Sequence, residues 1–315
     1  MKQSLLSVLT KKSLRLLAAL FLVVTSVFSL PQAAQAFPIY AQQAYDSPRE
    51  ANGRIVCANC HLAAKPTQVE VPQAVLPDTV FEAVIKIPYD TDAQQVLGSG
   101  DLGPLNVGAV LMLPDGFQIA PDDRIPEKMK EEINGVFYQK YKPDTDNVIV
   151  VGPLSGADHQ EIIFPVLSPD PATDPNIHFG KYSVHAGGNR GRGQIYPTGD
   201  KTNVNAVTSP AAGLVSSVSE NSVTITTNDG QTVTESIPAG LEVVVSEGQA
   251  VADGAPLSSD PNVGGFGQKD TEIVLQSGTR IKWLMVFFSA IMISQTLLVL
   301  KKKQVEKVQA AEMNF

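Results

Sequence analysis

The residues whose types and spacing point most directly to chemistry lie in the run Cys57-Ala58-Asn59-Cys60-His61, which contains both cysteines of the chain. Two thiols separated by two residues and followed at once by histidine form the attachment signature of c-type haem. The thiols bond to the haem vinyl groups, and the histidine is placed to ligate the iron from one face. The sequence therefore predicts one covalent haem c on Cys57 and Cys60, with His61 as an axial iron ligand.

Two other uses of the same residues compete with haem attachment. A thioredoxin-like redox pair would be expected in a βαβ setting, which the pattern around the motif does not show. A structural zinc site would need two further ligands at suitable spacing, and none accompany this pair. A haem-free thiol protein on the exported side stays as an alternative, but covalent haem attachment is favoured.

The second axial position of the iron is not decided by the motif. Methionine is the usual partner of histidine in electron-transfer cytochromes, and the candidates are Met112 and Met129. The other side-chain candidates are His159, His178 and His185. An open iron face, as in a peroxidase-like haem protein, also fits the pattern, so the residues themselves leave the sixth ligand open.

Both ends of the chain carry targeting signals. Residues 1–36 contain a basic stretch, an apolar run and Ala34-Gln35-Ala36, which is the layout of a cleaved signal peptide, so Phe37 is the expected mature N-terminus. Residues 283–300 are eighteen residues without a charge, and at 1.5 Å per residue they span roughly 27 Å. The lysines that follow predict that the tail, residues 301–315, is cytoplasmic and that residues 37–281 are exported.

Short apolar runs separated by proline and glycine dominate the exported part and predict a mainly β fold, an antiparallel β-sandwich. In the first run, Phe81, Ala83, Ile85 and Ile87 share one face. The expected strands are Thr79–Pro88, Val107–Leu113, Asn147–Val151, Glu161–Leu167, Tyr182–His185, Ser222–Thr227, Thr232–Ile237, Leu241–Val245 and Glu272–Leu275.

Two helices are expected in this part. The first begins at a capping box, Ser47-Pro48-Arg49-Glu50, and runs toward Leu62. The second covers Asp122–Ile133 and ends at Asn134-Gly135.

A change in composition predicts two exported domains. Residues 207–258 are rich in Ser, Thr and Val, with a hairpin signal at Asn228-Asp229-Gly230, and form a small inserted β domain. Residues 37–206 and 259–281 form the large haem-binding domain. Residues 245–257 look like the half-barrel repeat of biotinyl and lipoyl domains, although the expected hairpin tip has no lysine for a swinging arm.

Charge excludes one class of partner. The whole chain has a net charge of −8, but residues 37–300 contain 16 basic and 30 acidic residues, a balance of −14. An acidic body of this size repels polyanions, so nucleic acid is not expected as a partner.

Several segments together resemble the cytochrome f family, and the signal peptide suggests a cyanobacterial member. They are Phe37-Pro-Ile-Tyr-Ala-Gln-Gln, Pro48-Arg-Glu-Ala, Gly53-Arg-Ile-Val-Cys-Ala-Asn-Cys-His-Leu-Ala, Gly180-Lys-Tyr-Ser-Val-His, Gly187-Gly-Asn-Arg-Gly-Arg-Gly-Gln, Pro261-Asn-Val-Gly-Gly-Phe-Gly and the Lys-rich tail. The resemblance implies an electron-transfer subunit of the cytochrome b6f complex that is not an enzyme by itself. It would carry single electrons from the Rieske iron–sulfur protein to plastocyanin or cytochrome c6.

The resemblance also implies roles for single residues. The sixth iron ligand would be the α-amine of Phe37, whose reference pKa near 8 is far below that of lysine. Haem-packing residues would be Tyr40, Pro153, Tyr196 and Pro197, and a buried water chain would be held by Gln95, Asn189, Gln194 and Asn262. One further water-chain asparagine of the family aligns with Val204, so either Asn203 or Asn205 replaces it or the chain of waters is shorter.

Partners and location follow from the same resemblance. It implies a dimeric complex with cytochrome b6, subunit IV and small subunits, in the thylakoid membrane, with the large domain in the lumen and the C-terminus on the stromal side. Plant members present a basic loop to acidic plastocyanin, whereas residues 94–103 here contain no lysine. The acceptor is therefore expected to be neutral or basic at its docking face.

Overall fold

The structure is a computed structural model that describes residues 38–313. The predicted signal peptide and Phe37 lie outside the described residues. The helical elements are α2 (Ile39–Ala44), the short 3₁₀ helix η1 (Val56–Asn59), α3 (Glu127–Glu132) and α4 (Gly278–Glu312).

Two sheets packed face to face form the main body. One has the strand order β1 (Gln68–Glu70), β3 (Val80–Lys86), β10 (Glu161–Leu167), β7 (Gln118–Ile119). The other has the order β2 (Ala74–Val75), β16 (Gly265–Leu275), β11 (Gly180–Arg190), β6 (Asn106–Met112), β9 (Val148–Ser155), β8 (Gln139–Lys140). Within the described part of the chain the neighbours in these sheets are antiparallel, apart from the parallel pair β2 and β16. The predicted antiparallel β-sandwich is confirmed.

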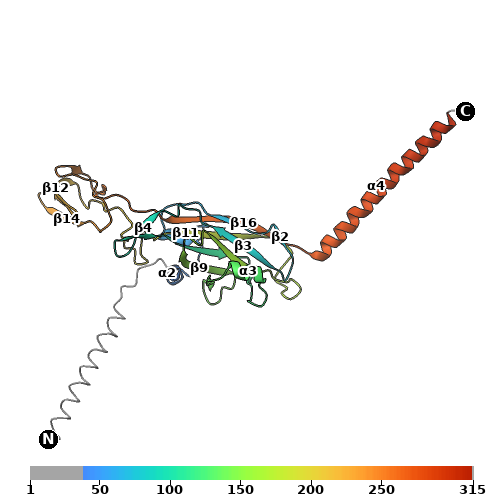
Figure 1. The fold of residues 1–315 in the computed structure, drawn as a ribbon, viewed down its shortest axis with the longest axis horizontal. Helices are drawn as coiled ribbons and strands as arrows, with labels where there is room; N and C mark the ends of the chain where they lie inside the picture. Colours follow the sequence, from blue (N-terminus) through green and yellow to red (C-terminus); the bar gives the residue numbers. More distant parts are fainter. Residues whose placement is uncertain (1–37, 314–315) are drawn as a thin grey trace, which may run out of the picture.

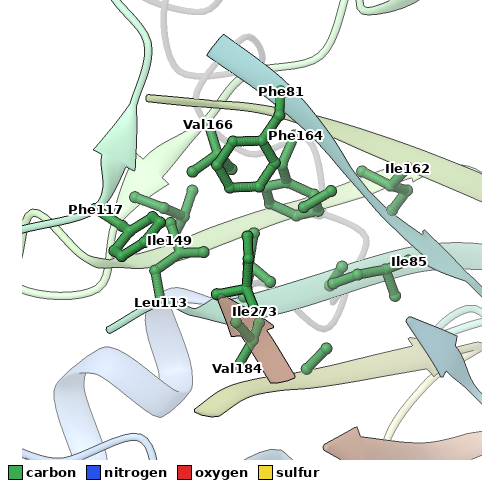
Figure 2. Packing of buried hydrophobic residues seen from close by; sticks show 14 of the residues in the cluster. Phe81, Ile85, Leu113, Phe117, Ile149, Ile162, Phe164, Val166, Val184 and Ile273 are labelled. Atoms are coloured by element: carbon green, nitrogen blue, oxygen red, sulfur yellow. The ribbon is translucent and has the colours of Figure 1, made fainter. Parts of the chain in front are cut away.

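The core of the sandwich follows from the alternation of side chains along each strand. Phe81, Ala83 and Ile85 of β3 are buried on one face, as expected, and Phe164 of β10 joins them. Side chains of the six-stranded sheet, such as Ile273 of β16, close the core from the other side (Figure 2). Full burial of each large apolar side chain stabilises the fold by about 1.5–3 kcal/mol.

The six-stranded sheet is apolar on both faces, and this decides where the functional site lies. On β6, Leu111 points into the sandwich core, whereas Val110 and Met112 belong to a second cluster on the opposite face. Ile55 and Tyr141 complete that second cluster. The outer face is therefore covered by the segment that carries the Cys-x-x-Cys-His motif.

A third sheet has its own core. Its strand order is β14 (Thr232–Ser236), β13 (Ser222–Thr227), β12 (Gly213–Ser219), β15 (Ala250–Val251). The expected hairpin at residues 228–230 is confirmed by the pairing of β13 with β14. The expected strand Leu241–Val245 is wrong, because only Val243 forms a bridge, to Ser258, while Leu241 and Val245 turn into this core. Figure 1 shows this sheet at the end of the body opposite α4, with the two-stranded pair β4 (Gln94–Val96) and β5 (Leu102–Pro104) between it and the sandwich.

The helix expected from Ser47 toward Leu62 is wrong. The segment instead turns back on itself, with a bridge between Arg49 and Ile55 and a tight turn at Gly53, whose φ is +89°. The Ser47 hydroxyl accepts from the amide of Arg49, two residues on, and Asn52 Oδ1 accepts from Arg54 N at 2.8 Å. Such local side-chain bonds offer the backbone an alternative to a helix. The motif therefore lies on the short helix η1.

The second expected helix is shorter than predicted. Instead of Asp122–Ile133, the helix α3 covers Glu127–Glu132. Pro126 precedes it in an extended conformation, and the residue before a proline is biased away from helical angles. Asn134 and Gly135 follow its end as expected.

The helix α4 contains the predicted membrane span. It has 35 residues, and among the described helices it is long and apolar enough to cross a membrane. No residue of its apolar stretch is buried against the rest of the protein. A continuous helix satisfies its own backbone hydrogen bonds, as a lipid environment requires.

Candidate haem site

A cavity lies on the outer face of the six-stranded sheet. Its walls come from α2, from η1 with His61, and from the segment that contains Tyr196 and Pro197. Its floor comes from β6, β9, β11 and β16, where Val110 and Phe266 contribute apolar surface. Segments separated by more than two hundred positions in the sequence therefore meet at one site.

Glycines on the strands make room for this cavity. An added Cβ at Gly187 of β11 would lie 2.4 Å from Phe266 Cζ, and one at Gly108 of β6 would lie 2.7 Å from Asn189 Oδ1. Gly193 borders the motif, because a Cβ there would lie 3.1 Å from the carbonyl oxygen of Cys60. Side chains at these positions would overlap with the residues that shape the cavity.

The motif is held on the sheet by one side chain of β16. Gln268 accepts from Ile55 N through Oε1 at 2.9 Å and donates through Nε2 to Gly53 O at 2.9 Å. One turn later, the amides of Cys60 and His61 both donate to Cys57 O, at 3.2 and 3.0 Å. This tight turn brings both sulfurs and the imidazole to the lining of the same cavity.

The protonation states of these groups suit a covalently held haem. Burial, helped by the positive charge of Arg190, lowers the pKa of His61 to about 4, so the imidazole is neutral and free to bind a metal. Burial raises the pKa of Cys57 to about 12 and also raises that of Cys60. His61 Nδ1 is enclosed and has no hydrogen-bond partner among the described residues. Two thiols and a neutral imidazole around one apolar cavity fit a c-type haem.

The helix α2 and the residue before it, Pro38, lie at the same cavity. Gln42 Nε2 donates to Tyr141 O at 2.9 Å, and the Tyr141 hydroxyl lies 2.9 Å from the carbonyl oxygens of both Ala41 and Tyr45. Pro38 and Tyr40 line the cavity. Sequence patterns did not predict this six-residue helix, whose position depends on a partner about 100 residues away.

The side-chain candidates for the sixth ligand all lie elsewhere. Met112 is packed in the cluster beneath the motif and Met129 in a separate cluster around α3. His159 bonds to Ser155 O, and His185 Nδ1 forms a hydrogen bond with Asp270 Oδ1 at 2.8 Å. None of these residues, nor His178, is among the described residues that line the cavity.

The residues expected to pack against the haem are only partly gathered at the cavity. Tyr40, Tyr196 and Pro197 line it. Pro153 does not line it and lies in β9, two residues beyond Val151, which does.

Of the four expected water-chain residues, one lines the cavity and the other three do not. Gln194 accepts from Leu62 N at 2.7 Å, and its Nε2 is buried without a partner among the described residues. Asn189 lines the cavity. Gln95 is bonded to protein at both ends, to Arg192 N and Pro104 O, and Asn262 accepts from Gly264 N.

The two asparagines beside Val204 have different partners. Val204 itself is buried. Asn205 Nδ2 donates to the carbonyl oxygen of Gln194, whereas Asn203 bonds to Arg192 Nη1 and to Leu97 O. Asn205 is therefore the neighbour bonded directly to an expected water-chain residue.

Sequence reasoning missed Arg190, which is fully buried behind His61. Its Nη2 donates to Pro66 O at 2.5 Å, while Nε and Nη1 have no partner among the described residues. Burial lowers the pKa of Arg190 to about 10. The only available signal was its place in the glycine-rich run that starts at Gly187, which does not distinguish a buried arginine from an exposed one.

Comparison with known proteins adds an independent finding. Two family models match, "Apocytochrome F, N-terminal" over residues 37–191 and "Apocytochrome F, C-terminal" over residues 203–315. A cytochrome f of Synechococcus elongatus is 65% identical over 309 residues, covering 96% of this chain and 98% of the relative. Cytochromes f of Rippkaea orientalis and a Nostoc species are 61% and 59% identical, each covering 98% of this chain and 98% and 97% of the relatives. Because the matches span both the haem motif and the C-terminal helix, the chain belongs to the cytochrome f family, the c-type cytochrome of the cytochrome b6f complex.

Proposed function

We propose that this chain carries a single covalent haem c on Cys57 and Cys60, ligated by His61 and by the α-amine of Phe37. It passes single electrons from the Rieske iron–sulfur protein to plastocyanin or cytochrome c6. The observation that carries the ligand assignment is the position of α2, whose preceding residue Pro38 lines the same cavity as His61. The amine of Phe37 is one peptide unit away from Pro38.

Exclusion of the alternatives supports the same ligand. The methionines and histidines considered as side-chain ligands are not among the described residues that line the cavity. An α-amine loses its proton much more readily than a lysine, because its reference pKa is about 8. Ligation would then depend on removal of the signal peptide, since an uncleaved chain has no amine at this position.

The bound haem supplies one-electron chemistry, and the protein sets its potential through the axial ligands, burial and nearby charge. The chain's own residues hold the group and restrict water. The Val110, Phe266 and Tyr40 side chains provide apolar surface at the cavity. No side chain is assigned an acid–base step, in keeping with an electron carrier within a larger reductase.

The arrangement in the membrane follows from α4 and the signal peptide. The haem-binding body, residues 37–206 and 259–281, and the small domain, residues 207–258, would lie in the thylakoid lumen. Residues 283–300 would span the membrane, and residues 301–315 would lie on the stromal side, among cytochrome b6, subunit IV and the small subunits of a dimeric complex. The separate cores of the sandwich and of the third sheet support this division into domains.

The test is to block the proposed amine ligand. A chain extended by one residue before Phe37 and acetylated should show a changed ligand-field spectrum and should bind added cyanide. A matched control, Phe37→Leu, keeps a free α-amine and should keep the parent spectrum. An unchanged spectrum in the blocked protein would refute the ligand assignment, and cyanide binding by the unmodified protein would favour the peroxidase-like alternative.

A further inference from the structure

Two large apolar side chains are exposed at the end of the sandwich from which α4 departs. Phe179 is 48% exposed and Leu76 is 45% exposed. Phe179 immediately precedes β11 and Leu76 immediately follows β2. Because β2 and β11 are the two neighbours of β16, these side chains flank the end of β16 on opposite sides.

Short connections hold both residues close to the beginning of the helix. Gly180 pairs with Leu275, the last residue of β16, so Phe179 lies beside the end of that strand. On the other side, Gln276 N donates to Val75 O at 2.8 Å. Leu76 Cδ2 lies 4.0 Å from the position of a Cβ on Gly278, the first residue of α4.

The membrane begins only a few residues later. The uncharged run starts at Trp283, five residues into α4, which is about 8 Å along a helix axis. Trp283 is 70% exposed, and tryptophan is enriched at the interface between lipid and water. Figure 1 shows the β2 end of the sheet next to the start of α4.

The backbone beside both side chains is already hydrogen-bonded, so it can approach a less polar medium at little cost. The carbonyl oxygen of Leu76 accepts from the hydroxyls of Thr79 and Ser168, each at 2.7 Å. On the other loop, the Tyr182 hydroxyl donates to His178 O at 2.5 Å and accepts from His178 N at 3.1 Å.

Charge near the two residues is balanced as well. The sequence has one carboxylate within two positions of either side chain, Asp78, and Arg124 pairs with it at 3.0 Å. Lys181, two positions after Phe179, forms an ion pair with Glu272. The charges nearest to Phe179 and Leu76 in the sequence are therefore paired, so the two exposed apolar side chains suit the interface of a bilayer.

From these observations we infer that Phe179 and Leu76 insert into the interface of the bilayer that α4 spans and form a second contact of the exported body with lipid. The inference rests on the proposed transmembrane position of α4. With one helix as its only attachment, the body could swing about residues 276–277. Contacts on both sides of β16 would restrict this motion and hold the sandwich at a defined tilt above the membrane.

Fluorescence quenching in lipid nanodiscs tests the inference with the full-length haem-containing chain. Trp283 is the only tryptophan, so a Trp283→Phe background allows single probes to be introduced as Phe179→Trp or Leu76→Trp. The matched control is Leu214→Trp, because Leu214 is 54% exposed on β12, at the far end of the body. Each protein is compared in phosphatidylcholine with and without bromine near the headgroup end of the acyl chains, so quenching by haem cancels in the ratio.

The Phe179→Trp and Leu76→Trp proteins should lose about half of their fluorescence in brominated lipid, because interfacial side chains lie about 5–10 Å into the boundary between headgroups and acyl chains. The Leu214→Trp control should lose almost none. If neither probe at the α4 end is quenched more than the control, the inference is overturned. The parent protein, with Trp283 in place, distinguishes failure of the second lipid contact from failure of the membrane span. If its Trp283 is quenched while both introduced probes are not, the membrane span stands and the second contact fails, and if Trp283 is not quenched the span itself fails.

Discussion

Replacing Gly187 by alanine should disturb the floor of the haem cavity in a measurable way. The added Cβ would lie 2.4 Å from Phe266 Cζ and 3.1 Å from Ile55 Cδ1, and both of these residues are buried. Carbon atoms that are not bonded prefer about 3.5–4.0 Å, so the Phe266 ring must move by about 1 Å. Overpacking of this kind costs about 1–3 kcal/mol, partly offset by the roughly 0.5 kcal/mol gained when a strand glycine becomes alanine.

The matched control lies on the same strand. An added Cβ at Gly180 would meet no atom within 4 Å, so Gly180→Ala should leave stability unchanged or raise it by about 0.5 kcal/mol. Equilibrium urea unfolding compares the three proteins, and the absorption spectrum reports whether the moved Phe266 ring alters the haem surroundings, because Phe266 lines the cavity. Equal unfolding midpoints for Gly187→Ala and Gly180→Ala would show that the close contact is relieved without cost, and the reasoning would be refuted.

Three other predictions follow. Tyr141→Phe removes the hydroxyl that donates to the carbonyl oxygens of Ala41 and Tyr45, so the free energy of unfolding should fall by about 1 kcal/mol. The oxidised haem should also bind cyanide faster, and an unchanged rate of cyanide binding would show that α2 does not depend on this bond. Burial raises the pKa of Tyr138 above 10, so the native state keeps a proton that the unfolded chain loses, and the free energy of unfolding should decrease as pH rises above about 10. This decrease should be less steep in Tyr138→Phe, and equal slopes would contradict the assignment. Electron transfer to the native acceptor should slow or stay flat as salt rises, and stopped-flow rates that increase with salt would exclude a neutral or basic docking face.

Local patterns predicted the features that depend on neighbours in sequence. The alternation in β3 gave the buried face of Phe81, Ala83 and Ile85, and the expected bounds of β10 and β13 agree with the structure. The span within α4 was also predictable, because length and apolarity alone decide whether a helix can cross a bilayer. These signals do not require knowledge of any distant contact.

The helix expected after Ser47 failed for the opposite reason. A capping box is a local signal, but Gln268 binds the backbone on both sides of Arg54 from more than 200 positions away. That bond, with the turn at Gly53, stabilises a hairpin-like path in place of a helix. Burial of Arg190 was likewise invisible, because an arginine beside glycines has the same local pattern on a surface and in a core.

The sequence by itself determined the chemistry that this protein is predicted to perform, since Cys57, Cys60 and His61 have the spacing that predicts c-type haem attachment. Only the tertiary structure decided which other residues reach that site. Among the described residues, the lining of the cavity includes Pro38 but none of the five methionines and histidines that were candidates for the sixth iron ligand. The hydroxyl of Tyr141 holds α2 against the sheet. The physical reason is that a Cys-x-x-Cys-His motif is made of neighbours along the chain, whereas the lining of the cavity around it depends on strands and helices that meet across a hundred residues or more.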